Sequence, residues 1–361
     1  MELELFTQNP KNQWHFISEK VFDGFKSLSV ALNYYTYSTF ELFVGLTPEN
    51  IRLFVPDTII YMEGLYFYVD SASVDDQATA QMKVSGKSLL GKTTDRIVYR
   101  IYNKTARPEQ IVWDHLTNEV INPTDIKRKI HYLKLNTVPN LGNSAIQYQN
   151  SYGNVAEEIE TLCTSYDFGI REEATQLGIP GNTLTIFRGR DISDTIEFSD
   201  AYENLTKAGY QNNTFDESST AFVFGEGEGS ERKQIVIGDD KAGLQRKELY
   251  VDARDLQKTT DTVTLTDAQY IEVLKNRGNN KLAEHKRILT LNGEVPASSK
   301  LYKLGTDYDR GDAVTIRSNL YNLKKKSTIT TIKKTYDAKG LFIEPIFGKE
   351  TPTIFDVLRR G

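Results

Sequence analysis

Residues 304–317 read LGTDYDRGDAVTIR, and the predicted fold is built around this stretch. Its first nine residues are rich in Asp and Gly and the segment after them is mostly β-branched, which is typical of a tight turn that opens a strand. Downstream, residues 327–336 alternate in a β-rich pattern, 337–340 supply a turn, and 341–348 return. We therefore expect a compact antiparallel sheet at this end of the chain.

The N-terminal part of the chain shows the same period of two. Apolar residues alternate with polar ones over 28–32 and again over 40–44, which predicts a hairpin. A second hairpin is predicted over 59–69, and a further strand over 81–84. Five or six short strands in about 85 residues favour a small barrel or sandwich.

The first residues of the chain lack this pattern. Residues 1–23 are expected to be irregular, with Trp14 and Phe16 as anchors. The segment 1–5 alternates acidic and apolar residues, which is unlike a signal peptide, and no apolar run approaches the ~18 residues of a membrane-spanning helix. We expect a soluble protein made in a cytoplasm.

Three helices are predicted in the remainder. The first begins at Pro108 and ends before Asn122-Pro123, and the second, capped by Ser151, carries apolar residues through Tyr166 at helical spacing. The longest covers 266–287 and begins with a capping box. Gly278 lies in the middle of this last helix, where glycine costs about 1 kcal/mol relative to alanine, so close packing of a neighbouring backbone is expected there.

Residues 168–260 are predicted to alternate strands and turns. The expected strands are 168–171, 184–188, 221–224, 233–237 and 247–251. The glycine-rich segment 225–230 lies between two of them. Phosphate-binding loops need a following helix and usually a lysine, whereas this segment carries two glutamates and leads into a strand. It is therefore interpreted as a flexible hairpin loop.

Length and charge limit the function classes. A chain of 361 residues is expected to form two to four domains. The net charge of −5 provides no basic field for tight DNA binding. The 20 Tyr and 17 Phe suit half-buried sheet surfaces and protein interfaces.

No catalytic, cofactor-binding or metal-binding residue is predicted. Cys163 is the only cysteine, so an intrachain disulfide is excluded, and its apolar helical surroundings favour a core residue over a nucleophile. The four histidines, His15, His115, His131 and His285, show no metal-binding spacing, and His285 is interpreted as a satisfied interface side chain. Carboxylates are too numerous for the sequence to exclude a glycosidase.

Three motifs near the C-terminus have structural and functional interpretations. Asp307, Asp309 and Asp312 imitate a calcium loop, but Ser318 stands where a bidentate Glu is needed, so an acidic turn is favoured. The tripeptide 310–312 has an integrin-type sequence but belongs to the turn. The lysines at 324–326, 333 and 334 are interpreted as a solvated edge that resists aggregation.

Several short motifs in order carry a family resemblance. They are Val84-Ser85-Gly86-x-Ser88-Leu89 with Arg96-Ile97, the glycine-rich hairpin followed by Val251-Asp252-Ala253-Arg254-Asp255, Tyr308-Asp309-x-Gly311-Asp312-x-Val314-Thr315, Tyr336-Asp337-x-x-Gly340 and Ile343-Glu344-Pro345-x-Phe347-Gly348. Together they resemble the tail hub proteins of siphophages, also called tail-associated proteins, whose core is similar to the baseplate hub of contractile phages. Residues 1–23 and 190–220 match nothing in that pattern.

The resemblance implies a β-rich α+β fold, with tube-forming antiparallel β-barrel domains and mixed α/β domains between them. The implied division is 1–86 as an N-terminal tube domain, 87–190 as an α/β domain, 191–265 as the second tube domain or its start, and 266–361 as the long helix and closing sheet. The implied protein is structural and has no enzymatic activity or cofactor. It would lie at the tail tip of a virion and be made in the bacterial host cytoplasm.

The resemblance also implies partners. A homotrimeric ring would close the tail tube and open for DNA, which would pass through without being bound. The ring would contact the distal tail protein ring, the tape measure protein and receptor-binding proteins. Two alternatives stay open: a carbohydrate-binding or depolymerising protein that recognises a cell surface, and a hub from a contractile particle or a defective prophage.

Overall fold

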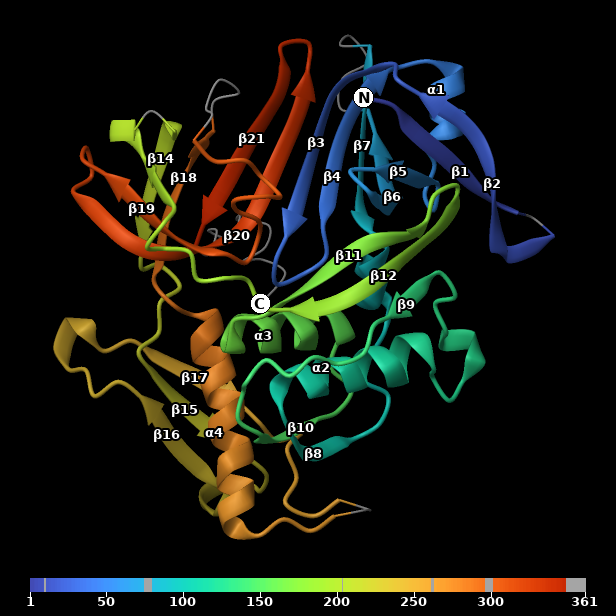
Figure 1. Ribbon diagram of the computed structural model, residues 1–361. Helices are drawn as coiled ribbons and strands as arrows, with labels where there is room; N and C mark the ends of the chain where they lie inside the picture. The colour runs from blue at the N-terminus through green and yellow to red at the C-terminus, as the bar shows by residue number, and fades with distance from the viewer. Residues whose placement is uncertain (10, 75–79, 203, 261–262, 296–300, 349–361) are drawn as a thin grey trace.

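A computed structural model describes the chain except for residues 10, 75–79, 203, 261–262, 296–300 and 349–361 (Figure 1). The elements lie in a large sheet, two smaller α/β layers beneath it and short connecting turns. The short 3-10 turns are η2 (Leu89–Asp95), η4 (Ile126–Arg128), η5 (Asp200–Tyr202), η6 (Gly229–Glu231) and η7 (Gly243–Gln245).

Seven N-terminal strands form one half of the large sheet. They are β1 (Leu3–Asn9), β2 (Asn12–Phe22), β3 (Phe25–Asn33), β4 (Thr39–Gly45), β5 (Ile59–Met62), β6 (Leu65–Ser73) and β7 (Gln81–Ser88), with helix α1 (Pro48–Leu53) between β4 and β5. The two predicted hairpins are confirmed as the antiparallel pairs β3–β4 and β5–β6. The predicted strand at 81–84 is β7, which continues to Ser88.

The prediction that residues 1–23 are irregular is wrong, because β1 and β2 pair antiparallel there. Register shifts after Leu5 and after Gln8 interrupt the pairing, and Leu5 and Phe6 are both buried. Such bulges disturb the strict alternation by which a strand is recognised in a sequence. Phe16 packs edge-on against Tyr132. The predicted anchoring by Trp14 lies outside the described side chains.

The predicted closing sheet is confirmed and belongs to the same large sheet. Its strands are β13 (Glu197–Ser199), β14 (Thr206–Asn213), β18 (Ile288–Glu294), β19 (Ala313–Ser318), β20 (Leu323–Asp337) and β21 (Gly340–Phe347). β20 pairs antiparallel with β19, with β21 and, over Thr331–Tyr336, with β3. The resulting order is β14-β18-β21-β20-β3-β4-β7-β6-β5-β1-β2, with β13 and β19 off this path.

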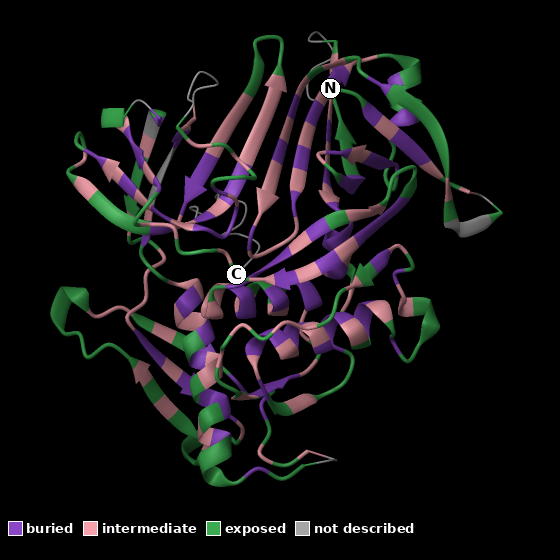
Figure 2. Cartoon of the chain, in the orientation of Figure 1, coloured by how far each residue is buried: buried purple, intermediate pink, exposed green. Residues whose placement is uncertain are grey.

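One face of this sheet covers two apolar cores. Along β4 and β7 every second side chain is buried, and in β3 Leu28 and Val30 are, as the colours of Figure 2 show. These side chains join those of β5 and β6 in one core, which includes Leu28, Leu42 and Val84. A second core gathers under β13, β19, β20 and β21 around Phe198 and Phe347.

The middle of the chain packs two helices against short strands. These elements are β8 (Tyr102–Ala106), α2 (Pro108–Leu116), β9 (Leu133–Leu135), β10 (Ile146–Asn150), α3 (Val155–Tyr166), β11 (Gly169–Gln176) and β12 (Ile179–Phe187). Both predicted helices are confirmed. The predicted cap Ser151 is wrong: Asn154 caps α3, with its side-chain oxygen accepting from the backbone N–H of Ala156. Cys163 is buried in this core, as predicted.

A third layer combines β15 (Thr220–Phe224), β16 (Gln234–Gly238) and β17 (Glu248–Asp252) with α4 (Asp267–Glu284). The capping box of Thr266 and Gln269 is present. Gly278 is buried, and a Cβ there would lie 2.6 Å from Val223 and 2.5 Å from Ile237. Close packing at Gly278 is therefore confirmed, but the neighbours are side chains and not a backbone.

The β-rich α+β class is confirmed, whereas the tube-forming barrel is not. Among the described residues the large sheet is open, because its path ends at β14 on one side and at β2 on the other. The barrel and the division into four domains stay predictions.

Tyr34, in the connection between β3 and β4, lies where the large sheet meets the middle layer. Its N–H donates to the carbonyl of Thr330, and its carbonyl accepts from Ile170 at 3.2 Å. Its hydroxyl accepts from the N–H of Gly189 at 3.2 Å. Gly311 has φ +89°, and a Cβ there would lie 2.5 Å from the Tyr34 ring. The turn that decides the fold is thus packed directly on this tyrosine.

Gly311→Ala is expected to lower the free energy of unfolding by about 2–4 kcal/mol, because it adds left-handed backbone strain to a collision with a ring that cannot move freely. Gly305→Ala is the matched control: Gly305 has φ +82° but nothing lies within 4 Å of its added Cβ. Urea denaturation measures both. Equal losses in the two variants would contradict the packing of Gly311 on Tyr34.

Gly278→Leu is expected to cost about 1–3 kcal/mol by overpacking α4 against Val223 and Ile237. Asn279→Leu, at the adjacent exposed position, provides the control. A thermal melt of each variant tests this, and an unchanged melting temperature for Gly278→Leu would show that the helix is not held against β15 and β16.

Candidate functional site

The first candidate surface is the face of the large sheet that points away from the cores. Where β3, β4 and β20 lie side by side, it forms a groove of about 560 Å³. Half of its lining residues are small or hydroxylated, and the larger ones are Asn33, Phe40, Glu41, Phe43, Lys333 and Ile346. The groove is therefore of mixed polarity, unlike the mostly apolar pockets that bind small ligands.

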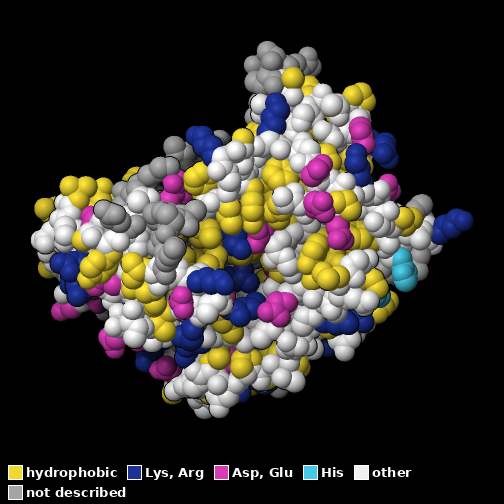
Figure 3. Space-filling view, turned by 45° about the horizontal axis from the view of Figure 1, so that its top comes forward, with side chains coloured by type: hydrophobic (Ala, Val, Ile, Leu, Met, Phe, Trp, Pro, Cys, Tyr) yellow, Lys and Arg dark blue, Asp and Glu magenta, His cyan; other side chains and the backbone are white. Residues whose placement is uncertain are grey.

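Charges on this face are largely neutralised within it. Lys83 pairs with Glu41 at 2.6 Å, and Lys87 pairs with Asp70 at 2.9 Å. Register places Lys333 of β20 directly beside Glu344 of β21. Figure 3 shows one face of the molecule, on which Lys and Arg side chains gather around the central hollow with Asp and Glu among them.

The acidic turn at 307–312 is used to hold the fold. Asp312 accepts from Arg190 at 2.6 Å, Asp309 pairs with Arg171 at 2.9 Å, and Asp307 accepts from the N–H of Lys303. The three carboxylates therefore point to three different partners, which supports their interpretation as an ordinary acidic turn. In the described part of the chain, no group of three His, Cys, Asp or Glu side chains is arranged to hold a metal ion.

The integrin-type tripeptide is inaccessible, because Arg310 and Asp312 are both buried. The lysine cluster lies on β20. Lys324, Lys325 and Lys326 are exposed, and Lys326 forms an ion pair with Asp191. Lys334, by contrast, points to the core side and pairs with the nearly buried Glu63 at 2.5 Å. The solvated-edge interpretation fits the first three lysines. It is wrong for Lys333 and Lys334, because β20 is paired there with β21 on one side and with β3 on the other.

Two other predicted features are found where expected. The glycine-rich segment 225–230 connects β15 and β16 as a hairpin loop. His285 ends α4, and its Nδ1 lies 2.9 Å from a carboxylate oxygen of Asp216, so it is a satisfied side chain.

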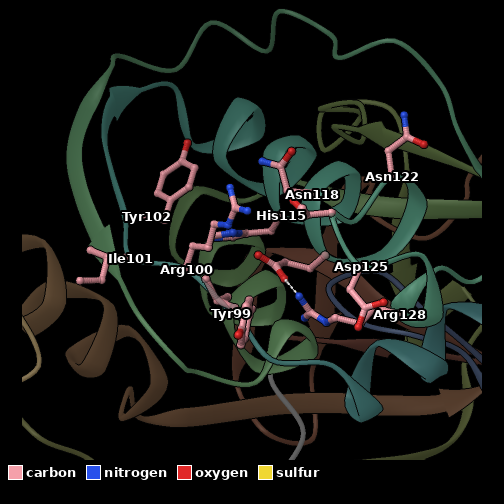
Figure 4. A pocket seen from close by; sticks show the side chains of 12 residues that line it. Tyr99, Arg100, Ile101, Tyr102, His115, Asn118, Asn122, Asp125 and Arg128 are labelled. Carbon is pink, nitrogen blue, oxygen red and sulfur yellow. Dashed lines mark ion pairs between the residues drawn. The ribbon is translucent and has the colours of Figure 1, made fainter. Parts of the chain in front are cut away.

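A second candidate surface, which the sequence did not reveal, is a pocket of about 390 Å³ beside α2 (Figure 4). We call it the α2 pocket. It is lined by Val98, Tyr99, Arg100, Ile101, Tyr102, His115, Asn118, Glu119, Asn122, Thr124, Asp125 and Arg128. These residues come from three separate stretches that each lack a recognisable motif. Only the fold brings them together.

The wall of the α2 pocket includes a turn of π-helix, Thr117–Ile121, which continues α2 and carries Asn118 and Glu119. Such turns are rare and are frequently found at functional sites. Arg128 lies 2.6 Å from Glu119, the ion pair drawn as a dashed line in Figure 4, and its guanidinium lies over the ring of Tyr99 at 5.3 Å.

His115 is one of two buried polar side chains of this pocket, with Glu119. It is 1% exposed, its ring packs on Tyr102 at 4.8 Å between centroids, and its Nε2 atom has no hydrogen-bond partner. Burial lowers the pKa of His115 to about 4, and the neighbouring Asp114 opposes this only partly. The imidazole is therefore neutral at pH 7.

Comparisons with known proteins agree on one class. The family described as Siphovirus ReqiPepy6 Gp37-like protein matches residues 3–349. No curated protein matches the chain in sequence. No helix among the described residues is long and apolar enough to cross a membrane.

Three crystal structures of tail proteins share the fold over nearly the full length of both chains. The tail protein from Neisseria meningitidis MC58 has 13% identity and a TM-score of 0.54, covering 96% of this chain and 97% of its own. The 43 kDa tail protein of prophage MuSo2 from Shewanella oneidensis has 13% identity and a TM-score of 0.53, covering 97% and 98%. Prophage tail protein gp18 from Listeria monocytogenes EGD-e has 16% identity and a TM-score of 0.54, covering 99% and 98%.

Lowering the pH from about 6.5 to about 4 is expected to destabilise the protein through His115. His115 binds a proton near pH 6.5 in the unfolded chain but only near pH 4 in the folded chain. Its contribution to the free energy of unfolding is therefore fully present above pH 6.5, and up to about 3 kcal/mol of it is lost as the pH falls to 4. Urea unfolding of wild type and His115→Phe at several pH values measures it. The difference between the two isolates His115 from the other acidic groups, and parallel pH profiles would contradict a neutral buried imidazole.

Proposed function

The chain belongs to the Siphovirus ReqiPepy6 Gp37-like family, and from this membership we propose that it is a structural hub of the phage tail tip. In this proposal three copies form a ring that closes the distal end of the tail tube and opens for DNA ejection into the host. The chain acts without covalent chemistry. The observation that carries the proposal is the 13-stranded sheet, whose main path among the described residues is open and ends at β2 and at β14.

The two ends of this path support assembly into a ring. β2 ends the sheet on one side and exposes Ile17 and Val21, which are 45% and 55% exposed. β14 ends it on the other side, where Tyr210 is partly exposed and stacks on Tyr321. An unpaired edge with exposed apolar side chains is a template for association. If the β2 edge of one copy meets the β14 edge of the next, the contact is head-to-tail. Such contacts form a closed ring when the rotation from one copy to the next adds up to a full turn.

The polar face of the sheet supports a passage for DNA. Its small hydroxylated side chains present little bulk, and its lysines lie beside acidic partners. Three copies carry a formal charge of −15, three times −5, so the wall is not expected to bind the phosphates of DNA tightly. In the proposal this face lines the tube.

The surroundings of the ring follow from its place in the tail. Three solved structures that share the fold are tail proteins, and the likeness spans both chains almost completely. We therefore place the ring beneath the distal tail protein ring, with the tape measure protein and receptor-binding proteins as further contacts. The opening of the ring is a rearrangement of protein interfaces.

Light scattering of the purified protein tests the ring. The expected species has three times the chain mass of 41.0 kDa over a range of concentrations, alone or with the distal tail protein. The double variant Ile17→Lys, Val21→Lys places two charges on the free edge of β2 and is expected to shift the mass to that of a monomer.

Leu244→Lys is the control, because Leu244 is fully exposed and lies in η7, outside the large sheet. A wild-type protein that stays monomeric even with the distal tail protein would contradict the trimer. A trimer that survives the double variant would show that β2 is not at the contact.

A further inference from the structure

One edge of the third layer is open. Strand β16 ends the order β16-β15-β17 and lies at the lower left of Figure 1, on the outside of this layer. Lys233 and Asp239, which flank β16, each bond through their backbone to a residue that flanks β15, at 2.8 Å. Because the backbone groups of successive residues point to opposite sides of a strand, those of Gln234 and Val236 point away from β15. Among the described residues no second strand pairs with them.

The sequence of β16 does not protect this edge. Its five residues, Gln234–Gly238, include no charged residue and no proline, which are two devices that commonly block an exposed strand edge. Val236 is 56% exposed, and the segment 239–245 that follows the strand is exposed throughout. The opposite edge strand, β17, begins and ends with a charged residue. In this layer, β16 is therefore the edge that is better suited to pair with an added strand.

Apolar side chains lie on both faces of the layer beside this edge. On the outer face Val236 lies opposite Phe222, and Phe222 lies opposite Tyr250, so three large side chains form a row across the sheet. On the other face Ile235 and Ile237 pack against the core beneath α4 and stay partly exposed. An added strand with apolar residues in its middle would extend both surfaces and remove them from water.

The two charged residues that flank β16 determine the ends of such a strand. Lys233 and Asp239 are exposed, and neither forms an ion pair within the described part of the chain. In an antiparallel pair the residue opposite Asp239 comes first in the added strand, and the residue opposite Lys233 comes last. Opposite charges on directly opposed residues stabilise a pair of strands, whereas like charges destabilise it. The matching strand therefore begins with a basic residue and has an acidic residue six positions later, the spacing of Lys233 and Asp239.

A second copy of this chain offers the same order of charges, since Lys233 precedes Asp239 in the sequence. Pairing of two β16 strands is two-fold, however, and joins copies in twos. In a ring of three it would leave one edge unpaired, whereas a strand from another protein can pair with all three. This choice between partners rests on the ring proposed above. The open edge itself does not depend on the ring.

We propose that β16 binds an extended segment of another protein as an added antiparallel strand. The first residue of this segment is basic, the middle residues are apolar and the seventh is acidic, and its backbone bonds to Gln234 and Val236. Each chain thereby binds a partner through a strand that is not part of the large sheet.

Fluorescence anisotropy on the full chain tests the proposal with a labelled synthetic peptide, Lys-Thr-Val-Ile-Val-Thr-Glu, whose ends are blocked. Its isoleucine is placed opposite Val236, and saturable binding is expected. The charge-swapped peptide, Glu-Thr-Val-Ile-Val-Thr-Lys, places like charges opposite Lys233 and Asp239 and is expected to bind about tenfold more weakly. The double variant Lys233→Glu, Asp239→Lys is expected to reverse this preference.

Val236→Pro removes one outward N–H without removing a hydrogen bond to β15, and is expected to weaken binding of the first peptide about tenfold. Val236→Thr is the matched control, because it keeps both the β-branched side chain and the N–H, and its binding is expected to change less than about threefold. Circular dichroism establishes that each variant is folded. If the proline variant does not fold, the exposed charge variant still tests the proposal.

Absence of saturable binding for both peptides overturns the proposal, as does equal binding by wild type and Val236→Pro. A preference of the wild type for the charge-swapped peptide overturns the antiparallel order. A mass in light scattering that doubles with concentration, and does not double in Val236→Pro, would assign the edge to a second copy instead. The two proposals fail separately: a monomer that binds the peptide contradicts the ring, and a trimer that does not bind it contradicts the added strand.

Discussion

The structure depends on the packing of three glycines around one tyrosine. Tyr34 leaves the large sheet after β3, and Gly169, Gly189 and Gly311 approach so closely that a Cβ on Gly169 would lie 2.2 Å from the carbonyl oxygen of Tyr34. A Cβ on Gly189 would lie 1.9 Å from the carbonyl oxygen of Gly311. Backbones from three distant parts of the chain thus meet at one buried ring. Because protein interiors are close-packed, this contact fixes the position of the middle layer relative to the sheet.

A buried polar network holds the other side of the same boundary. Asn182 of β12 accepts from the N–H of Tyr66 and donates to its carbonyl, both at 3.0 Å. The same amide donates to Glu172, which also accepts from the N–H of Leu90. Burial raises the pKa of Glu172. A fully bonded network of this kind permits only one relative placement of the parts that it joins, whereas an apolar contact tolerates sliding. The α2 pocket and the polar sheet face are therefore presented in a fixed arrangement.

The sequence predicted local elements well and their long-range partners poorly. Strict alternation revealed the β3–β4 hairpin, and helical spacing revealed α3. The bulges in β1 removed that alternation, so the first strands were missed. Asn154 and Ser151 are both good capping residues, and only the backbone of the folded chain shows which one caps. The pairing of β3 with β20 is set by contacts between distant segments, and no local pattern encodes it. The α2 pocket was missed for the same reason: its residues are unremarkable until the π-helical turn and the strand ends bring them together.

The pairing of β3 with β20 also sets the order of events during synthesis. Ser29 and Thr335 lie side by side although 306 positions separate them in the chain. On the ribosome, the N-terminal strands emerge long before the strand that joins them, and their sheet ends at an uncovered β3. Closing so long a loop is slow, and uncovered strand edges promote misassembly in the meantime. A nascent chain cannot offer a finished sheet to its neighbours until β20 has been made. Completion of the large sheet therefore waits until translation has passed Asp337, the last residue of β20.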